Sequence, residues 1–236
     1  MFLAINLKKY RIGFLCILCC IIISGLIITG VVSANATPKL GFTIVIDAGH
    51  GGMDGGTVSA DGKVKESDIN LEYAKAMKKQ LESCGFKVVL TRTSSDGLYS
   101  RFGTNYKDED MQKRKDIILE TKPDLVLSMH TNFFTDTSQK GSQVFYQEGD
   151  EKSKALAQSV QEQLKSKLGT TRECLSGDFY ICKCHPYLSI ICECGFLSNT
   201  EDLAKITSEE FKQQYCYAVA CGIIATLITP NTQISG

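Results

Sequence analysis

The sequence lacks a surplus of either charge. Its 236 residues include 26 lysines and arginines and 26 aspartates and glutamates, so the formal net charge is zero. Domains that bind nucleic acid or another polyanion are typically basic. The composition therefore gives no support for a nucleic-acid partner. With 43% hydrophobic residues, the chain has enough material for one globular domain and a short appendage.

Several common catalytic motifs are also missing. There is no GxSxG turn to expose a nucleophilic serine, no Gly-Lys-Ser/Thr to hold phosphates, and no HExxH helix. A cysteine nucleophile would need a nearby histidine to form its thiolate, and His185 beside Cys184 is the one local pairing. Adjacent side chains on a strand point to opposite faces, which disfavours this pair.

One long hydrophobic run is present, near the N-terminus. Basic residues precede an uncharged, mostly apolar segment from Ile12 to Val32, and a membrane-spanning helix needs about 20 such residues. Basic residues on the N-terminal side orient that side toward the cytoplasm. We therefore expect residues 1–36 to form a basic flank, a membrane-spanning helix and a spacer. Residues 37–236 would then form a globular domain on the extracytoplasmic side of the cell membrane.

A cleavable signal peptide is the alternative interpretation of the same segment. Ala34-Asn35-Ala36 is an acceptable small-residue cleavage site, although the apolar run is longer than the usual signal core. Cleavage would release the domain outside the cytoplasm instead of leaving it on the membrane. We favour the retained anchor.

Cysteine is unusually frequent for an exported domain. Of the eleven cysteines, three lie in the apolar run and eight follow it, and exported domains normally pair their thiols. The Cys182-x-Cys184 and Cys192-x-Cys194 pairs would each share one face of a strand without bonding to each other. We interpret most of the eight as buried small apolar residues. Disulfides, or a second, structural metal at the two pairs, are the alternatives.

Hydrophobic periodicity predicts alternating strands and helices after the spacer. This alternation indicates an α/β fold, a single domain whose twisted, mainly parallel sheet is covered by helices on both faces. Such sheets place their functional sites at the carboxyl ends of strands. The predicted strands are 42–46, 87–91, 125–129, 144–146 and 188–192, and the predicted helices are 67–84 (capped by Ser67 or Asp68), 111–120, 154–168, 201–206 and 209–228.

The chain has only three histidines, and two of them follow predicted buried strands. His50 and His130 should therefore lie at the same edge of the sheet. Glu66 ends a glycine-rich loop just before a helix, from where it can reach the same edge. Two histidines and one carboxylate form a common catalytic zinc set. The fourth position stays open for water, whose pKa the metal lowers to about 7.

Glu193 is a fourth candidate residue for this site. It follows the apolar strand predicted at 188–192. A carboxylate buried there would be costly unless it met a metal, a water molecule or a cation. We predict that Glu193 is the general base.

Four ordered blocks of the sequence resemble one enzyme family. They look like the N-acetylmuramoyl-L-alanine amidases of the Amidase_3 family, and the resemblance covers nearly all of 42–228. The blocks are Ile46-Asp47-Ala48-Gly49-His50-Gly51-Gly52, Lys65-Glu66, Ser128-Met129-His130-Thr131-Asn132 and Cys192-Glu193-Cys194-Gly195-Phe196-Leu197-Ser198-Asn199.

The resemblance implies roles for the residues identified above. His50, Glu66 and His130 would hold Zn²⁺, and Glu193 would activate water and protonate the departing amine. The substrate would be peptidoglycan, cut at the amide between N-acetylmuramic acid and the stem peptide. A zinc peptidase that cuts within the stem peptide and a non-catalytic peptidoglycan-binding or regulatory domain are the alternatives.

The layout is similar to that of the sporulation-type, membrane-anchored members of the family, which act in spore cortex maturation. Thr91-Arg92 and Arg114 also resemble family positions. The chain lacks wall-binding repeats. We therefore expect targeting to come from the membrane anchor or from an activating or targeting protein partner. Cys192 and Cys194 should face away from Glu193 and pack beneath the site.

Overall fold

The computed structural model describes residues 40–100 and 105–228. The predicted membrane-spanning segment and its alternative cleavage site lie outside these residues. Within the described ranges, no helix is long and apolar enough to cross a membrane.

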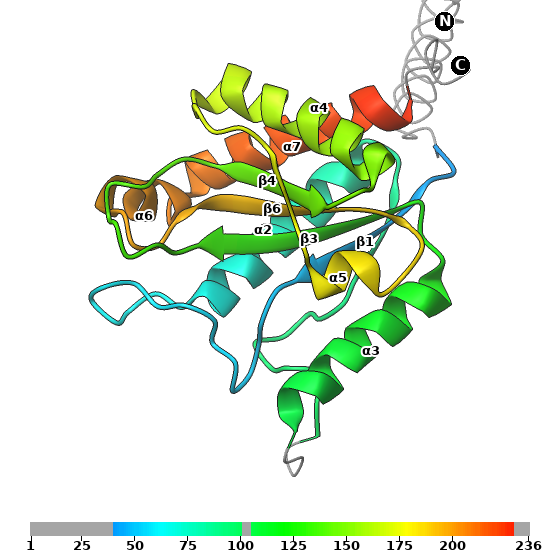
Figure 1. Cartoon of the computed structure of the whole chain (residues 1–236), viewed down its shortest axis with the longest axis horizontal. Helices are drawn as coiled ribbons and strands as arrows, with labels where there is room; N and C mark the ends of the chain where they lie inside the picture. Colours follow the sequence, from blue (N-terminus) through cyan, green and yellow to red (C-terminus); the bar gives the residue numbers. More distant parts are fainter. Residues whose placement is uncertain (1–39, 101–104, 229–236) are drawn as a thin grey trace, which may run out of the picture. The chain divides into compact units, whose positions relative to one another are not determined.

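A six-stranded sheet in the order β2-β1-β3-β6-β4-β5 forms the centre of the domain (Figure 1). Neighbouring strands are parallel except for β4 and β6, which are antiparallel. The prediction of a mainly parallel sheet is thereby confirmed, and one antiparallel pairing makes the sheet mixed. The strands are β1 (Thr43–Ala48), β2 (Lys87–Leu90), β3 (Leu125–Asn132), β4 (Gln143–Gln147), β5 (Leu175–Gly177) and β6 (Leu188–Phe196).

Helices pack on both faces of this sheet, as predicted. The larger hydrophobic cluster joins one face to α2, α4 and α7, and the smaller cluster joins the other face to α3 and α5. Figure 1 shows α4 and α7 on one side of the sheet and α3 on the other. The helices are α2 (Glu66–Ser83), α3 (Tyr106–Thr121), α4 (Glu151–Leu168), α5 (Tyr180–Lys183), α6 (Thr200–Ile206) and α7 (Glu209–Leu227).

Alternation along β1 shows how the sequence assigns side chains to the two faces. Ile44 and Ile46 belong to the larger cluster, whereas Val45 belongs to the smaller one, because successive strand side chains point to opposite faces. On the larger-cluster side, α4 and α7 approach closely. A Cβ at Gly222 of α7 would lie 2.5 Å from Cα of Val160 on α4, so this crossing requires glycine.

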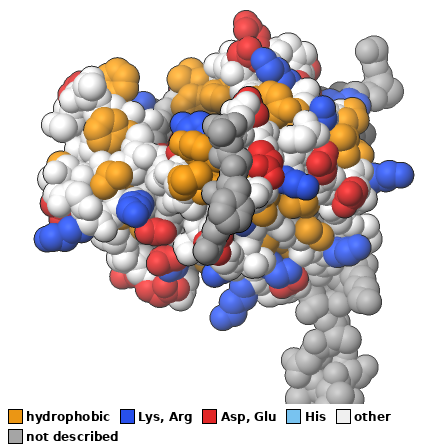
Figure 2. All heavy atoms as spheres, turned by 90° about the horizontal axis from the view of Figure 1, so that it is seen from below, with side chains coloured by type: hydrophobic (Ala, Val, Ile, Leu, Met, Phe, Trp, Pro, Cys, Tyr) orange, Lys and Arg blue, Asp and Glu red, His pale blue; other side chains and the backbone are white. Residues whose placement is uncertain are grey.

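The other face is less completely filled. Its buried hydrophobic residues are Val45, Ile118, Val126, Ile181, Cys182 and Ile191. A cavity of about 330 Å³ is lined by residues of α3 and α5 and by both predicted histidine ligands. Figure 2 views the molecule from below Figure 1, where basic, acidic and hydrophobic side chains are interspersed.

Several predicted boundaries were wrong. Helix α2 begins at Glu66 after Lys65, without a side-chain cap, so neither Ser67 nor Asp68 caps it. Helix α3 begins at Tyr106 instead of position 111. Strands β3 and β6 continue to Asn132 and Phe196, because their buried pattern extends through polar residues that sequence analysis had placed beyond the strands.

The segment around the first cysteine pair was also misread. Cys182 lies in the short helix α5, and Cys184 is that helix's C-terminal cap. The pair therefore does not share the face of a strand. Strand β5 and helix α5 were not predicted, because elements of three and four residues are too short to show a hydrophobic period.

Candidate metal centre

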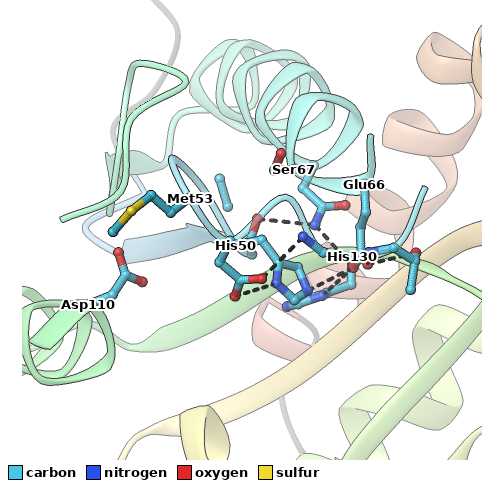
Figure 3. Close-up of polar contacts among 12 residues, drawn as sticks. His50, Met53, Glu66, Ser67, Asp110 and His130 are labelled. Carbon is cyan, nitrogen blue, oxygen red and sulfur yellow. Dashed lines mark hydrogen bonds and ion pairs between the residues drawn. The ribbon is translucent and has the colours of Figure 1, made fainter. Parts of the chain in front are cut away.

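Three side chains from separate parts of the fold point toward one another (Figure 3). His50 follows β1, Glu66 begins α2, and His130 lies on β3. Oε1 of Glu66 is 3.2 Å from Nε2 of His50 and 2.9 Å from Nδ1 of His130. The structure thus brings together the three ligands that the sequence predicted.

Their spacing fits a metal ion. Tetrahedral zinc with nitrogen and oxygen ligands at about 2.0–2.1 Å would hold two donor atoms roughly 3.3 Å apart. One ligand atom from each of the three residues lies within 4.8 Å of the other two. Among the described residues, no other group of histidine, cysteine or acidic side chains has such a geometry. The structure therefore does not support the alternative of a structural metal at the cysteine pairs.

The backbone and one neighbouring carboxylate orient His50. Its φ of 61° lies in the left-handed region, which is uncommon for a residue with a Cβ. Nδ1 of its ring is 2.9 Å from Oδ2 of Asp54, which leaves Nε2 facing Glu66. A carboxylate on the outer nitrogen of a metal-binding histidine fixes the ring and raises its basicity.

The position of the His130 ring requires that residue 49 have no side chain. A Cβ at that position would lie 2.2 Å from Nε2 of His130 and 2.3 Å from Cε1. The imidazole therefore packs directly against the backbone that follows β1. Only glycine permits this approach.

Glu66 is buried, and both of its oxygens are occupied. Oε2 accepts hydrogen bonds from the backbone N–H and the hydroxyl of Thr57, at 2.9 and 3.0 Å, while Oε1 faces the imidazoles. Burial opposes its charge, but the hydrogen bonds and charges of the two histidines hold the pKa of Glu66 well below its usual range. Burial likewise opposes the charge of His50, yet Glu66 and Asp54 raise its pKa to about 9. The site therefore favours positive charge.

Glu193 lies next to this group on the adjoining strand. It pairs with His130 across the parallel strands β3 and β6, so the two side chains share a face of the sheet. Its Oε2 is buried and has no hydrogen-bond partner among the described residues. Burial is the largest influence and raises the pKa of Glu193 to about 7, a value suited to exchanging protons near neutral pH.

Comparison with known proteins agrees with this geometry. The sequence model of the family described as N-acetylmuramoyl-L-alanine amidase, Amidase_3, matches residues 44–225. The chain belongs to this amidase family. LytC of Bacillus subtilis is 30% identical over 200 residues, which are 84% of this chain and 38% of LytC. The germination-specific N-acetylmuramoyl-L-alanine amidase of the same organism is 30% identical over 193 residues, which are 79% of this chain and 80% of that protein.

Solved structures of amidases share the fold. The CwlD amidase from Clostridioides difficile, solved in complex with the GerS lipoprotein, has a TM-score of 0.76 and 34% sequence identity. That match covers 79% of this chain and 98% of CwlD. The catalytic domain of CwlV from Bacillus (Paenibacillus) polymyxa has a TM-score of 0.70 and 27% identity, with the same coverage of both chains. The family resemblance drawn from the sequence motifs is confirmed.

The cysteines of this amidase-family chain take no part in the site. All eight within the described residues are free thiols. Cys192 and Cys194 belong to the larger core cluster, on the face opposite Glu193, as predicted. Burial raises the pKa of both thiols far above the usual range. All eight are thus buried or partly buried thiols that form no disulfide.

The disfavoured pairing of Cys184 with His185 is not formed. Sγ of Cys184 donates to the carbonyl of Ile181, while Nδ1 of His185 accepts from the backbone N–H of Tyr187. The hydrogen bonds of the two residues are made elsewhere.

Some residues that support the predicted ligands were not predicted from the sequence. Asp54 was not predicted to support His50, although its position four residues after His50 is visible in the sequence. Arg92 and Arg114 were linked to the family by resemblance alone, without a physical role. Their contacts depend on the turn after β1, which the sequence does not display.

Proposed function

We propose that this chain is a zinc-dependent N-acetylmuramoyl-L-alanine amidase that hydrolyses the amide between muramic acid and the stem peptide of peptidoglycan. One observation carries the proposal. Nε2 of His50, Oε1 of Glu66 and Nδ1 of His130 converge beside Glu193, which has an unpartnered buried oxygen. The chain's membership of the amidase family supports the choice of substrate.

The residues have distinct roles in this proposal. His50, Glu66 and His130 would hold zinc, which when bound supplies a Lewis acid that lowers the pKa of water and polarises a carbonyl. Glu193 takes a proton from the attacking water and transfers it to the departing nitrogen, so its pKa of about 7 allows both halves of the transfer. Asp54 keeps the His50 ring in position.

The cavity beside the ligands would hold the substrate. It is lined by His50 and His130, by Met111 of α3, and by Tyr180 and Ile181 of α5. Because it opens on the same face of the sheet as Glu193, a peptide segment in it would present its amide to the proton carrier.

We further propose an extracytoplasmic, membrane-anchored location and a role in spore cortex maturation. The basic and apolar N-terminal sequence supports the first. The name of one relative, a germination-specific amidase, supports the second, and another relative was solved in complex with a lipoprotein. The latter also suggests that a protein partner activates or targets this chain.

The proposed activity is tested by product analysis. The full chain is incubated with purified peptidoglycan, with added zinc or with a chelator, and the soluble products are identified by mass spectrometry. An amidase releases intact stem peptides and leaves peptide-free muramic acid. Fragments cut within the stem would indicate a zinc peptidase instead, and binding without any product would indicate a non-catalytic domain.

A further inference from the structure

Two buried arginines contact the backbone of the turn that carries His50. Arg92 follows β2 and Arg114 lies on α3, and their exposed fractions are 3% and 1%. Neither side chain supplies a metal ligand. Together they donate hydrogen bonds to three consecutive carbonyl oxygens, those of Ala48, Gly49 and His50.

Arg114 holds the two ends of this turn. Its Nη1 donates to the carbonyl of Ala48 at 2.7 Å, and its Nη2 donates to the carbonyl of His50 at 2.6 Å. Charge-assisted hydrogen bonds of this length are among the stronger polar contacts in proteins. They offset the conformational strain of His50, which has a Cβ and a left-handed backbone conformation. Arg114 therefore stabilises the backbone conformation that aims the His50 ring.

Arg92 joins the same turn to the start of α2. Its Nε donates to the carbonyl of Ala48 at 2.9 Å, and its Nη2 donates to the carbonyls of Gly49 and Ser67, at 3.0 and 2.8 Å. Ser67 directly follows Glu66. One planar guanidinium thus fixes the distance between the segments that supply two of the metal ligands.

Buried acids keep Arg114 in place and balance its charge. Nε of Arg114 is 2.5 Å from Oδ2 of Asp110, and Nη1 is 2.6 Å from Oδ1 of Asp47. Asp47 also accepts hydrogen bonds from the hydroxyls of Thr91 and Ser128, both at 2.8 Å. The guanidinium position is therefore set from β1, β3, α3 and the residue that follows β2.

We propose that Arg92 and Arg114, here called the arginine clamp, are positioning residues that hold His50 and Glu66 in the ligand geometry before a metal binds. The clamp would thereby set the zinc affinity of the site. This inference rests on the metal site of the proposed function. Supporting contacts around metal ligands are typically worth about 10–100-fold in affinity.

The geometry requires arginine and not merely positive charge. Arg114 uses Nε, Nη1 and Nη2 on separate acceptors, and Arg92 does the same. Lysine keeps the charge but offers a single nitrogen, which cannot span the turn. Arg92→Lys and Arg114→Lys therefore separate positioning from charge balance.

The test is a zinc titration of the full chain in competition with a chromophoric chelator. We expect each lysine variant to bind zinc about 10–100-fold more weakly than the unchanged chain, and the zinc concentration for half-maximal activity to shift in parallel. Arg172→Lys is the matched control, because Arg172 donates to the carbonyl of Lys140 outside the metal ligands. Its zinc affinity should stay unchanged.

Thermal unfolding of the metal-free proteins separates positioning from general stability. Leu164→Ala, in the larger core cluster, should lower the melting temperature without changing zinc affinity. Folded lysine variants that bind zinc as tightly as the unchanged chain would overturn the proposed role of the arginine clamp but not the metal site. If Arg114→Lys does not fold, Arg92→Lys decides the test, and failure of both to fold where Leu164→Ala folds would also overturn it. An unchanged chain that binds no zinc would overturn the metal site and the clamp together.

Discussion

The two faces of the sheet differ in what they bury. The face toward α2, α4 and α7 carries a large, almost wholly apolar cluster. The face toward α3 and α5 carries few apolar residues, the buried ion pair of Asp47 and Arg114, and the cavity beside the predicted metal ligands. One face thus supplies most of the apolar core, and the other carries the cavity and Glu193, although both derive from alternate residues of the same strands.

Strand β6 shows this division within four consecutive residues. Cys192 and Cys194 are buried in the apolar cluster, whereas Ile191 and Glu193 face α5 and the cavity side. A substitution in the apolar cluster should therefore change stability alone, whereas a substitution at Glu193 should change the chemistry.

Glu193→Gln should lower the rate of amide hydrolysis by about 10²–10⁴-fold, because the amide keeps the shape of the side chain but cannot carry the proton. The melting temperature and zinc affinity should stay close to those of the unchanged chain. Product release from peptidoglycan, followed by mass spectrometry, measures the rate. Glu201→Gln, at an exposed ion pair with Lys140, is the control. Near-normal turnover by Glu193→Gln would contradict its role.

Gly49→Ala should weaken zinc binding by about 100-fold, since the added Cβ would lie 2.2 Å from the His130 ring and displace a metal ligand. Chelator competition measures the affinity. The matched control is Gly55→Ala in the same loop, where the nearest atom is 3.7 Å away. Equal zinc affinity in both variants would show that zinc binding does not require the present position of the His130 ring.

Leu164→Ala should lower the free energy of unfolding by about 3 kcal/mol, because it leaves a cavity in the larger cluster. Zinc affinity and the hydrolysis rate of the folded protein should not change. Denaturant unfolding measures the free energy of unfolding, and chelator competition measures the zinc affinity. A parallel loss of zinc affinity would mean that the two faces are not independent.

Lowering the pH should reduce the stability of the folded protein, because it protonates Asp47. Despite its burial, the Arg114 contact lowers the pKa of Asp47 to about 2, from 3.8. A lowered folded-state pKa gives stability that is present above the unfolded pKa and is lost as the pH falls through the folded pKa. The contribution is about 2 kcal/mol and should disappear between about pH 5 and pH 2.

Unfolding measured against pH for the unchanged chain and for Asp47→Asn tests this point. The stability difference between the two should shrink as the pH falls over that interval. A difference that is independent of pH would assign the effect of the substitution to packing instead of to the ionised pair.

The sequence predicted the parts of the molecule that follow from local patterns. Buried strands ending near His50 and His130 placed both rings at one edge, and Glu66 before a helix reached the same edge. Alternation along β6 was enough to separate Glu193 from Cys192 and Cys194. These predictions needed only the period of a strand and the topology of a parallel sheet.

Other features depended on contacts between distant segments. Arg114 meets the carbonyl of His50 across 64 residues, and Arg92 meets that of Ser67 across 25. No local pattern reports such contacts, because they arise from how α3 and the end of β2 pack on the turn. The reversed direction of β4 and the short elements β5 and α5 were missed for a similar reason.

The most direct test of the account is the analysis of peptidoglycan products formed by the unchanged chain and by Glu193→Gln, each with zinc and with chelator. The account predicts peptide-free muramic acid and intact stem peptides from the unchanged chain with zinc only. Glu193→Gln should bind zinc and release almost nothing. Release that persists in chelator, or equal release by the two proteins, would contradict a zinc amidase that uses Glu193 as its proton carrier.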